Sequence, residues 1–308
     1  MVIVRAMGGL GNQLQQYALY RKLEYMGKDA RLDTSWFHNE ALQANMPAGR
    51  ELELNYLNLP PYKVASEAEI CALLGRLWEE PEHIGAKIKR KLCPATNPAF
   101  EENGLYHPQI LSMENKYLVG YWACEKYYGD ILDTLREDIS FPKCSDGVLQ
   151  RRNEEMSRQM EETMSVSVHI RRGDYLDEIN RGLFGGICTE AYYHKAITYM
   201  KERVPGARFY LFSDDVSYVR EHYQGEEYQV IDWNHGRDSF YDMMLMSRCR
   251  HNICANSTFS FWGARLNAHR DKIMIRPSIH KNTQVCVPEQ MKELWTGWIL
   301  VTPQGGFA

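Results

Sequence analysis

The chain has 308 residues, 44% of them hydrophobic and 25% charged, which is ordinary for a globular protein of about two domains. Its formal net charge of -4 gives no reason to expect a nucleic acid as partner, so any anionic ligand must be held by a local cluster of cations. No apolar run reaches the roughly 18 residues of a membrane-spanning helix.

The amino terminus has the pattern of a strand and a glycine turn, which is not the pattern of a signal peptide. The eight cysteines are scattered and include no C-x-x-C pair, which argues against a structural zinc site. We therefore expect reduced thiols in a cytoplasmic protein.

Residues 2–6 are predicted to form a strand that leads into a glycine-rich turn over residues 8–13. A helix over residues 13–26 and a second strand over residues 30–32 are expected next. The turn matches part of a dinucleotide-binding fingerprint, but Leu14 stands where the third glycine belongs. The remaining prediction is a turn at a helix N-terminus whose amides can bind an anion.

Residues 36–115 are irregular and contain several prolines, and the segment after them is expected to form a strand and an aromatic-rich helix start. Aromatic side chains at this density usually belong to a core. Alternatively, part of this segment faces a cleft, where flat apolar rings suit a sugar. The residues concerned are Tyr121, Trp122, Glu125 and Lys126.

A domain boundary is expected at residues 142–147, which divides the chain into residues 1–143 and 144–308. The second part alternates between short apolar strands and helices of about 10 to 15 residues, which predicts a parallel sheet with right-handed crossovers and an α/β fold. The expected strands are residues 166–170, 208–212, 228–231, 251–255 and 272–276.

Three of these strands are followed by polar clusters. The first leads into H-I-R-R-G-D-Y at residues 169–175, the second into S-D-D at residues 213–215, and the third into N-S-T at residues 256–258. Because the carboxyl ends of parallel strands meet at one edge of the sheet, the three clusters are expected to converge there.

The first cluster carries the cations. An arginine at such an edge can bind two oxygens of an anion at once, and we assign that role to Arg171. Arg172 is expected to pair with an acid such as Asp174 and to shape the loop.

The second cluster has two interpretations. Ser213 can cap a helix while the carboxylates of Asp214 and Asp215 contact ligand hydroxyls, or the two carboxylates can hold a metal ion. Metal-dependent sugar transferases use D-x-D, whereas these carboxylates are adjacent, so we favour the first interpretation. The third cluster is typical of a hydroxyl-rich helix N-terminus, which suits a phosphate.

Five segments form a set in chain order: G-G-L-G-N-Q at residues 8–13, G-Y-W with E-K-Y at 120–127, H-I-R-R-G-D-Y at 169–175, F-S-D-D at 212–215 and A-N-S-T-F-S-F-W-G-A at 255–264. This set resembles the motifs of the bacterial α-1,2-fucosyltransferases of glycosyltransferase family 11. The departures are small, and residues 36–110, where the match is weak, are where we expect acceptor preference to be determined.

The resemblance implies a GT-B architecture, in which two Rossmann-like domains face each other across a cleft. Residues 1–143 would form the acceptor-side domain and residues 144–308 the domain that binds GDP-β-L-fucose. The implied reaction is an inverting transfer of L-fucose to the 2-hydroxyl of a galactoside, with no obligatory metal and no cofactor besides the donor. It also implies action in the cytoplasm, with peripheral association to a membrane-linked glycan.

The expected roles follow from the charge that builds on the β-phosphate as the bond to fucose breaks, because groups already aimed at it stabilise the transition state most. Arg171 is the predicted clamp. The resemblance adds His169 to the donor site and Asp242 to the nucleoside, although Asp242 can also be a charge favoured by a helix N-terminus. The predicted donor site is Gly9, Gly11, Asn12, Gln13, His169, Arg171, Ser213, Asp214, Asp242, Asn256, Ser257, Thr258 and Ser260.

The predicted catalytic residues are Arg171, His169, Asp174 and Asn12. The general base stays open among Asp174, Glu125 and Asp214, because no spacing singles out one carboxylate. A highly dissociative step would need only a weak base, even a phosphate oxygen.

Three other functions remain in view. The same donor motifs allow a fucosyltransferase of another linkage or acceptor. A nicotinamide-dependent GDP-sugar reductase or epimerase is disfavoured by the missing third glycine and by the lack of a Tyr-x-x-x-Lys pair. A non-catalytic carbohydrate or adhesion module could be built on the Arg-Gly-Asp tripeptide.

Overall fold

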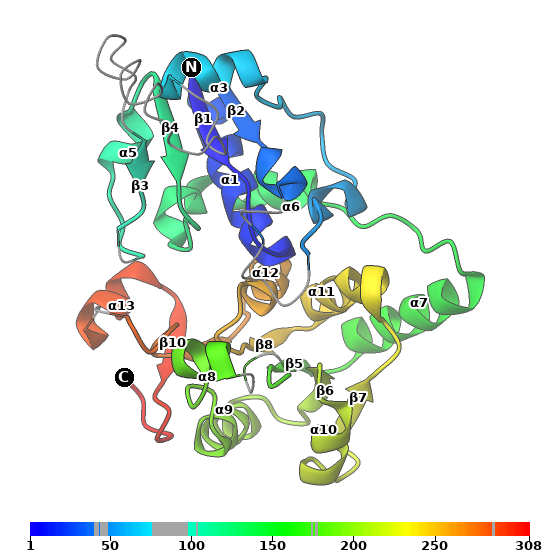
Figure 1. Ribbon diagram of the computed structural model, residues 1–308. Helices are drawn as coiled ribbons and strands as arrows, with labels where there is room; N and C mark the ends of the chain where they lie inside the picture. The colour runs from blue at the N-terminus through cyan, green and yellow to red at the C-terminus, as the bar shows by residue number, and fades with distance from the viewer. Residues whose placement is uncertain are drawn as a thin grey trace. The chain divides into compact units, whose positions relative to one another are not determined.

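The computed structural model describes residues 1–39, 43, 49–75, 98–102, 104–173, 175, 178–284 and 287–308. These residues form two compact units, Met1–Ser140 and Phe141–Ala308 (Figure 1). The division falls at residue 140, where the sequence analysis expects it at residue 143.

The first unit contains a sheet of four parallel strands in the order β2-β1-β4-β3. The inner strand β1 (Val2–Arg5) is completely buried, in keeping with its continuous apolar run. The strand order reverses between β1 and β4 (Lys116–Val119), so the loops after these two strands lie at a switch point, where open α/β sheets bind ligands.

The remaining elements of this unit are short, apart from α1, and many of them are 3₁₀ turns. They are α1 (Leu10–Tyr25), β2 (Ala30–Asp33), η1 (Ser35–His38), η2 (Glu53–Tyr56), α3 (Glu67–Leu74), β3 (Ala99–Phe100), α5 (Gln109–Ser112), η3 (Glu125–Tyr127), η4 (Gly129–Ile131) and α6 (Leu132–Asp138).

Helix α1 begins at Leu10, where the sequence analysis expects residue 13. The reason is that Gly9 acts as the N-cap, and its carbonyl accepts the amides of Asn12 at 2.9 Å and Gln13 at 3.0 Å. The helix ends just before Gly27, whose φ of +78° favours glycine.

The second unit contains six parallel strands in the order β10-β9-β8-β5-β6-β7. Counted from β5, this is the 3-2-1-4-5-6 order of dinucleotide-binding sheets, read from the opposite edge. The switch point lies between β5 and β8. The strands are β5 (Ser165–Ile170), β6 (Arg208–Ser213), β7 (Tyr228–Ile231), β8 (His251–Ile253), β9 (Met274–Pro277) and β10 (Trp298–Val301).

Helices cover both faces of this sheet (Figure 1). Apolar residues of α9 pack with β5 and β6 on one face, and residues of α7 and α11 pack with β6 and β7 on the other. The helices are α7 (Gly147–Glu162), α8 (Glu178–Phe184), α9 (Glu190–Arg203), α10 (Val216–His222), η6 (Gly236–Ser239), α11 (Phe240–Arg248), α12 (Thr258–Leu266) and α13 (Pro288–Leu294).

Both units are therefore α/β with a parallel sheet, and the fold-class prediction is confirmed. The sequence analysis missed two strands at the sheet edges, β3 and β10. β3 has only two residues, and its pairing with β4 decides its conformation. None of the helices that the structure describes combines the length and apolar character needed to cross a lipid bilayer.

The cysteines in the described residues are free thiols, namely Cys71, Cys124, Cys144, Cys188, Cys249 and Cys254. Cys93 and Cys286 lie outside the described residues.

Candidate functional site

The carboxyl ends of β5, β6 and β8 lie side by side in the second unit. β5 pairs with β6 up to Ile170 opposite Ser213, and with β8 up to Val168 opposite Ile253. The loops that follow the three strands therefore leave the same edge of the sheet, next to its switch point.

His169 is the next-to-last residue of β5 and is only 6% exposed. Its ring lies 5.9 Å from the ring of Phe259, which belongs to the first turn of α12. Its carbonyl accepts a hydrogen bond of 2.9 Å from the hydroxyl of Tyr193. The histidine thus joins the end of β5 to the start of α12.

The two arginines after β5 pair with the two aspartates after β6. Arg171 Nη1 lies 3.0 Å from Asp214 Oδ2, and Arg172 Nε lies 3.2 Å from Asp215 Oδ2. The Arg172 amide also donates to Asp214 Oδ1 at 2.9 Å, and its guanidinium lies 3.6 Å from the centre of the Tyr218 ring. These contacts hold both arginines in the loop.

The sequence predicts that Arg172 pairs with an acid such as Asp174. Among the described residues its acidic partner is Asp215, which follows β6 and is 43 residues away in the chain. Asp174 itself lies outside the described residues. The loop is shaped by tertiary contact, which local spacing cannot reveal.

The cap after β6 also differs from the prediction. The Asp215 side chain accepts the Tyr218 amide at 3.1 Å and caps α10. The Ser213 hydroxyl instead donates to the Ile170 carbonyl at 2.7 Å and accepts the Asp215 amide at 3.0 Å, which ties β6 to β5. A side chain at Gly173 would collide with Asp214, since a Cβ there would lie 2.7 Å from Oδ2.

The segment after β8 leads into α12, with Ser257 as the N-cap. The Ser257 side chain makes no capping hydrogen bond, and its carbonyl accepts from the Ser260 hydroxyl at 3.1 Å. Ser257 and Thr258 are both partly exposed. The amides of a helix N-terminus attract anions, so this end of α12 suits a phosphate next to His169.

Asn256 is predicted to contact the donor, but its side chain forms hydrogen bonds within the protein instead. It is buried, and its amide group donates to the carbonyls of Phe184 at 3.3 Å and His280 at 3.1 Å, while Oδ1 accepts from the Cys188 thiol. Both amide hydrogens are used to hold neighbouring loops. Asn256 therefore shapes the loop after β8.

Asp242 lies in the first turn of α11. Its Oδ1 accepts from Asn234 at 2.8 Å, and Asn234 in turn exchanges hydrogen bonds with Asn153 of α7. Burial raises the pKa of Asp242 to about 7, and the hydrogen bond from Asn234 opposes the shift. A carboxyl with this pKa is partly protonated at neutral pH, and its contact with a nucleoside stays a prediction.

In the first unit, the glycine turn differs from the predicted anion-binding turn. The amides of Asn12 and Gln13 are used inside α1, and the Gln13 side chain donates to the carbonyls of Gly8 at 2.8 Å and Glu51 at 2.9 Å. The Asn12 side chain lies against Gly8, so a Cβ added at Gly8 would lie 2.7 Å from Asn12 Nδ2. The φ of Gly8 is +78°, which also favours glycine. Gly11 is the second residue of α1.

A carboxylate occupies the end of α1 where a phosphate was expected. Glu53, the first residue of η2, accepts a hydrogen bond from the Leu10 amide. Sequence reasoning missed it, because it lies 40 residues after the turn, in a segment without a clear pattern.

The aromatic residues Tyr121 and Trp122 after β4 differ in how far they are exposed. Trp122 is fully buried, has a φ of +54°, and its ring lies 5.5 Å from that of Tyr127. Glu101 holds this turn, since its Oε2 accepts the amides of Tyr121 at 2.7 Å and Trp122 at 3.0 Å. Tyr121 is 45% exposed. The cleft-facing interpretation is therefore wrong for Trp122, while Tyr121 remains available to a ligand.

Glu125 and Lys126 lie in η3, and the Lys126 ammonium is 5.8 Å from the centre of the Tyr106 ring. Among the described residues, no three His, Cys, Asp or Glu side chains group closely enough to hold a metal ion.

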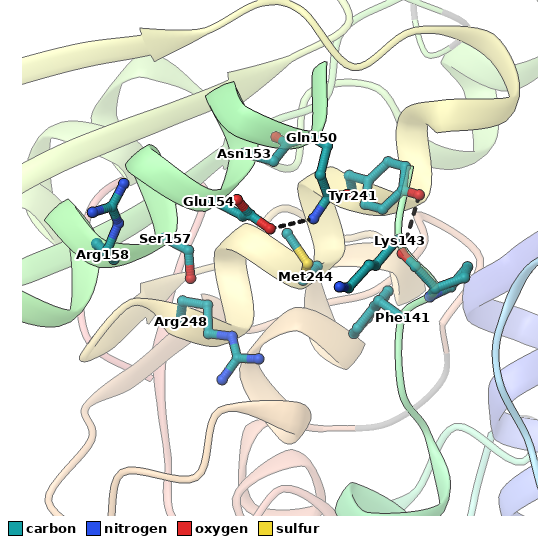
Figure 2. A pocket seen from close by; sticks show the side chains of 11 residues that line it. Phe141, Lys143, Gln150, Asn153, Glu154, Ser157, Arg158, Tyr241, Met244 and Arg248 are labelled. Atoms are coloured by element: carbon teal, nitrogen blue, oxygen red, sulfur yellow. Dashed lines mark hydrogen bonds between the residues drawn. The ribbon is translucent and has the colours of Figure 1, made fainter. Parts of the chain in front are cut away.

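A surface groove of about 440 Å³ runs between α7 and α11, and none of the residues that line it is a predicted donor residue (Figure 2). Lys143, Arg158 and Arg248 line it together with Met244 and Tyr241. Figure 2 shows the Tyr241 hydroxyl directed at the backbone beside Lys143, where it donates to the Pro142 carbonyl at 3.1 Å.

Comparisons with known proteins show which family the chain belongs to. An α-1,2-colitosyltransferase of Escherichia coli is 32% identical over 287 residues, which cover 90% of this chain and 91% of its own. The O-antigen biosynthesis glycosyltransferase WbnK of Escherichia coli is 32% identical over 291 residues, covering 88% and 91%. A galactoside α-(1,2)-fucosyltransferase 1 of Leontopithecus chrysomelas is 31% identical over 103 residues, which are 33% of this chain and 28% of that protein.

Among solved structures, a variant of Arabidopsis thaliana FUT1 in complex with GDP has a TM-score of 0.47 and 12% identity, covering 91% of this chain and 71% of that one. The family described as Glycosyl transferase family 11 matches residues 107–301, which include all three strand-end clusters of the second unit. With that match and the two relatives aligned over nearly its whole length, the chain belongs to glycosyltransferase family 11.

Proposed function

We propose that the protein transfers L-fucose from GDP-β-L-fucose to the 2-hydroxyl of a terminal galactoside, with inversion at the anomeric carbon. The observation that carries this proposal is the end of β5, where His169 contacts Phe259 in the first turn of α12 and Arg171 is held by Asp214 after β6. Membership in a transferase family argues against the reductase, the epimerase and the non-catalytic module.

The proposed mechanism rests on charge. When the bond between fucose and the β-phosphate breaks, the electron pair stays on GDP while the sugar becomes cationic. Arg171 is held at the sheet edge by Asp214 and would grip the phosphate oxygens as their charge grows. The amides of the first turn of α12 and the hydroxyls of Ser257 and Thr258 would meet the same phosphate.

A second donor is favoured by one observation. The colitosyltransferase relative aligns with 90% of this chain, whereas the fucosyltransferase relative aligns with 33%. Colitose differs from fucose by lacking the 3-hydroxyl, so a site that binds one sugar through its other hydroxyls can accept both. The alternative donor is therefore GDP-colitose.

The setting follows from the relatives. Escherichia coli WbnK is named for O-antigen biosynthesis, and a chain of this family would act on a similar surface glycan during its assembly. We propose action in the cytoplasm, with peripheral association to a membrane-linked acceptor, and no metal requirement.

The test uses purified protein with lactose and either GDP-fucose or GDP-colitose. GDP release is measured, and the linkage of the product is assigned by NMR. We expect release with GDP-fucose and an α-linked fucose on O2 of the galactose. Turnover with GDP-colitose alone would replace the donor, a product at another hydroxyl would overturn the linkage, and no transfer from either donor would overturn the proposed class of donor.

A further inference from the structure

Asp214 directly follows β6 and is predicted either to contact ligand hydroxyls or to act as the general base. Its oxygens, however, are engaged inside the protein. Oδ2 lies 3.0 Å from Arg171 Nη1, and Oδ1 accepts the Arg172 amide at 2.9 Å. Both carboxylate oxygens are thus directed at the loop after β5, which carries the arginine that we expect to bind the phosphate.

Gly173, in the same loop, leaves the room that this carboxylate occupies. A Cβ at Gly173 would lie 2.7 Å from Asp214 Oδ2 and 3.0 Å from its Cγ, which is well inside van der Waals contact. The φ of Gly173 is outside the left-handed region, so space and not backbone conformation is the reason for glycine there. An added methyl group could be accommodated by rotation of the carboxylate, but that rotation would break its contact with Arg171.

Arg171 also contacts the ring of Tyr175, whose centre lies 5.8 Å from the guanidinium carbon. Tyr175 is itself fixed, since its hydroxyl donates to the Asn256 carbonyl at 3.0 Å and its ring stacks on that of Phe184. Asp214 follows β6 and Asn256 follows β8, and both strands pair with β5. The arginine at the end of β5 is thus connected to the loops that follow both neighbouring strands.

A fixed guanidinium is what a phosphate clamp needs. Charged groups that are already oriented stabilise developing charge without a cost of reorganisation, whereas a long side chain that must first be ordered loses conformational entropy. The pair also remains accessible to a ligand, because the side chains of Arg171 and Asp214 are 30% and 24% exposed. An anion can therefore reach a guanidinium whose orientation the carboxylate already sets.

We propose that Asp214 is a positioning residue, which orients the guanidinium of Arg171 toward the phosphate of the donor. The glycine of the R-R-G-D segment is required because it leaves room for this carboxylate. Asp214 then acts through Arg171 and contacts neither the sugar nor the acceptor hydroxyl. This assignment rests on the proposed function and adds to it the residues that hold the clamp.

The test is a double-mutant cycle of Asp214→Asn and Arg171→Lys, with transfer from GDP-fucose to lactose as the activity. Asparagine keeps an oxygen for the Arg172 amide and removes the charge that faces Arg171. We expect Asp214→Asn alone to lower kcat by roughly 10–10², with the Kd for GDP within several-fold of wild type. In the Arg171→Lys background it should lower kcat by less than about threefold more. Losses that multiply would overturn the proposal, because Asp214 would then act on the substrate itself.

Gly173→Ala tests the same contact without removing a charge. We expect kcat to fall by roughly tenfold, and to fall little further when Asp214→Asn is already present. Gly182→Ala in α8 is the control and should match wild type, because nothing lies within 4 Å of a Cβ added there. Full activity in Gly173→Ala would overturn the proposal, since its methyl group must displace the carboxylate.

Asp232→Asn is the matched control for the loss of an ion pair. Asp232 directly follows β7, as Asp214 follows β6, and it pairs with Arg220. The exposed fractions of the two aspartates are 23% and 24%. Because such an exposed pair contributes little, Asp232→Asn should keep kcat within about twofold of wild type. An equal loss of kcat at Asp232 would overturn the assignment, because any broken ion pair would then suffice.

A spectroscopic readout makes the test independent of sugar transfer. The Nε–H signal of Arg171 in heteronuclear NMR spectra is assigned by its absence in Arg171→Lys. It should shift or broaden in Asp214→Asn and in Gly173→Ala, and stay unchanged in Asp232→Asn. An unchanged signal in both of the first two variants would overturn the positioning role, and Gly173→Ala alone decides if Asp214→Asn does not fold. A wild type that transfers no sugar would instead refute the proposed function, whatever the signal shows.

Discussion

At the scale of single residues, Arg171 and Arg172 form a matched pair. Both are paired with an aspartate after β6, but Arg171 is the predicted phosphate clamp, whereas Arg172 stacks on Tyr218 of α10. Replacing each arginine by lysine distinguishes the phosphate clamp predicted for Arg171 from the loop-shaping role predicted for Arg172.

Arg171→Lys keeps the charge but loses the forked guanidinium. The expected result is a fall in kcat of roughly 10²–10³ with GDP affinity within several-fold of wild type, because the contact strengthens as the phosphate gains charge. Arg172→Lys is the control and should reduce kcat far less. Steady-state kinetics and GDP titration of both variants test this prediction. An equal fall of kcat in Arg172→Lys would show that the clamp is wrongly assigned to Arg171.

Asp242 predicts a pH dependence of stability. Its pKa is raised in the folded protein to about 7 from 3.8, so the folded state keeps the proton that the unfolded state releases. The wild type should therefore lose stability as pH rises from about 4 to about 7, on the order of 2–4 kcal/mol, and no further above that.

Asp242→Asn removes this titration and keeps an oxygen for Asn234. Urea unfolding of both proteins should give similar stabilities near pH 4 and a growing advantage of the variant up to pH 7. A difference that does not change with pH would show that the carboxyl is ionised throughout.

At the scale of elements, the turn after β4 combines a buried ring with an exposed one. Trp122 stands in a left-handed conformation that costs free energy, and its burial together with the two amide hydrogen bonds to Glu101 offsets that cost. The neighbouring Tyr121 lies at the same switch point but is exposed.

Trp122→Ala should destabilise the protein by about 3–5 kcal/mol, as expected for a buried tryptophan. Tyr121→Ala is the comparison and should leave the unfolding midpoint nearly unchanged, while raising the acceptor KM if its ring contacts the sugar. Denaturant unfolding curves test the first statement, and a stable Trp122→Ala variant would contradict the core role.

At the scale of the whole molecule, binding of the donor nucleotide should stabilise the folded state selectively. A ligand at one hundred times its Kd adds about 2.7 kcal/mol. We expect GDP to raise the Tm while UDP and ADP at the same concentration leave it nearly unchanged. Equal shifts with all three nucleotides would contradict recognition of the base, including the part assigned to Asp242.

The acidic pair after β6 leads to a prediction about metal. Because Asp214 and Asp215 are paired with arginines, they already have counter-charges. EDTA should therefore leave most of the transferase activity intact. A loss of more than about tenfold that manganese restores would assign the pair to a metal site.

Much of this protein could be predicted from the sequence. Alternation of apolar strands and helices predicts the parallel sheet of the second unit, since buried parallel strands need continuous apolar runs. The order of the strands then places the clusters after β5, β6 and β8 at one edge, so the position of His169 and Arg171 followed from the chain alone.

Other features were decided only by tertiary structure. The partner of Arg172, the burial of Trp122 and the meeting of Glu53 with the end of α1 all depend on residues distant in the chain or on packing that no local pattern records. Strand and helix formation follow local periodicity, whereas pairing and desolvation of side chains depend on which segments the fold brings together. For that reason the sequence determines the family and the sheet edge, and the fold determines which side chains pair with one another and which are buried.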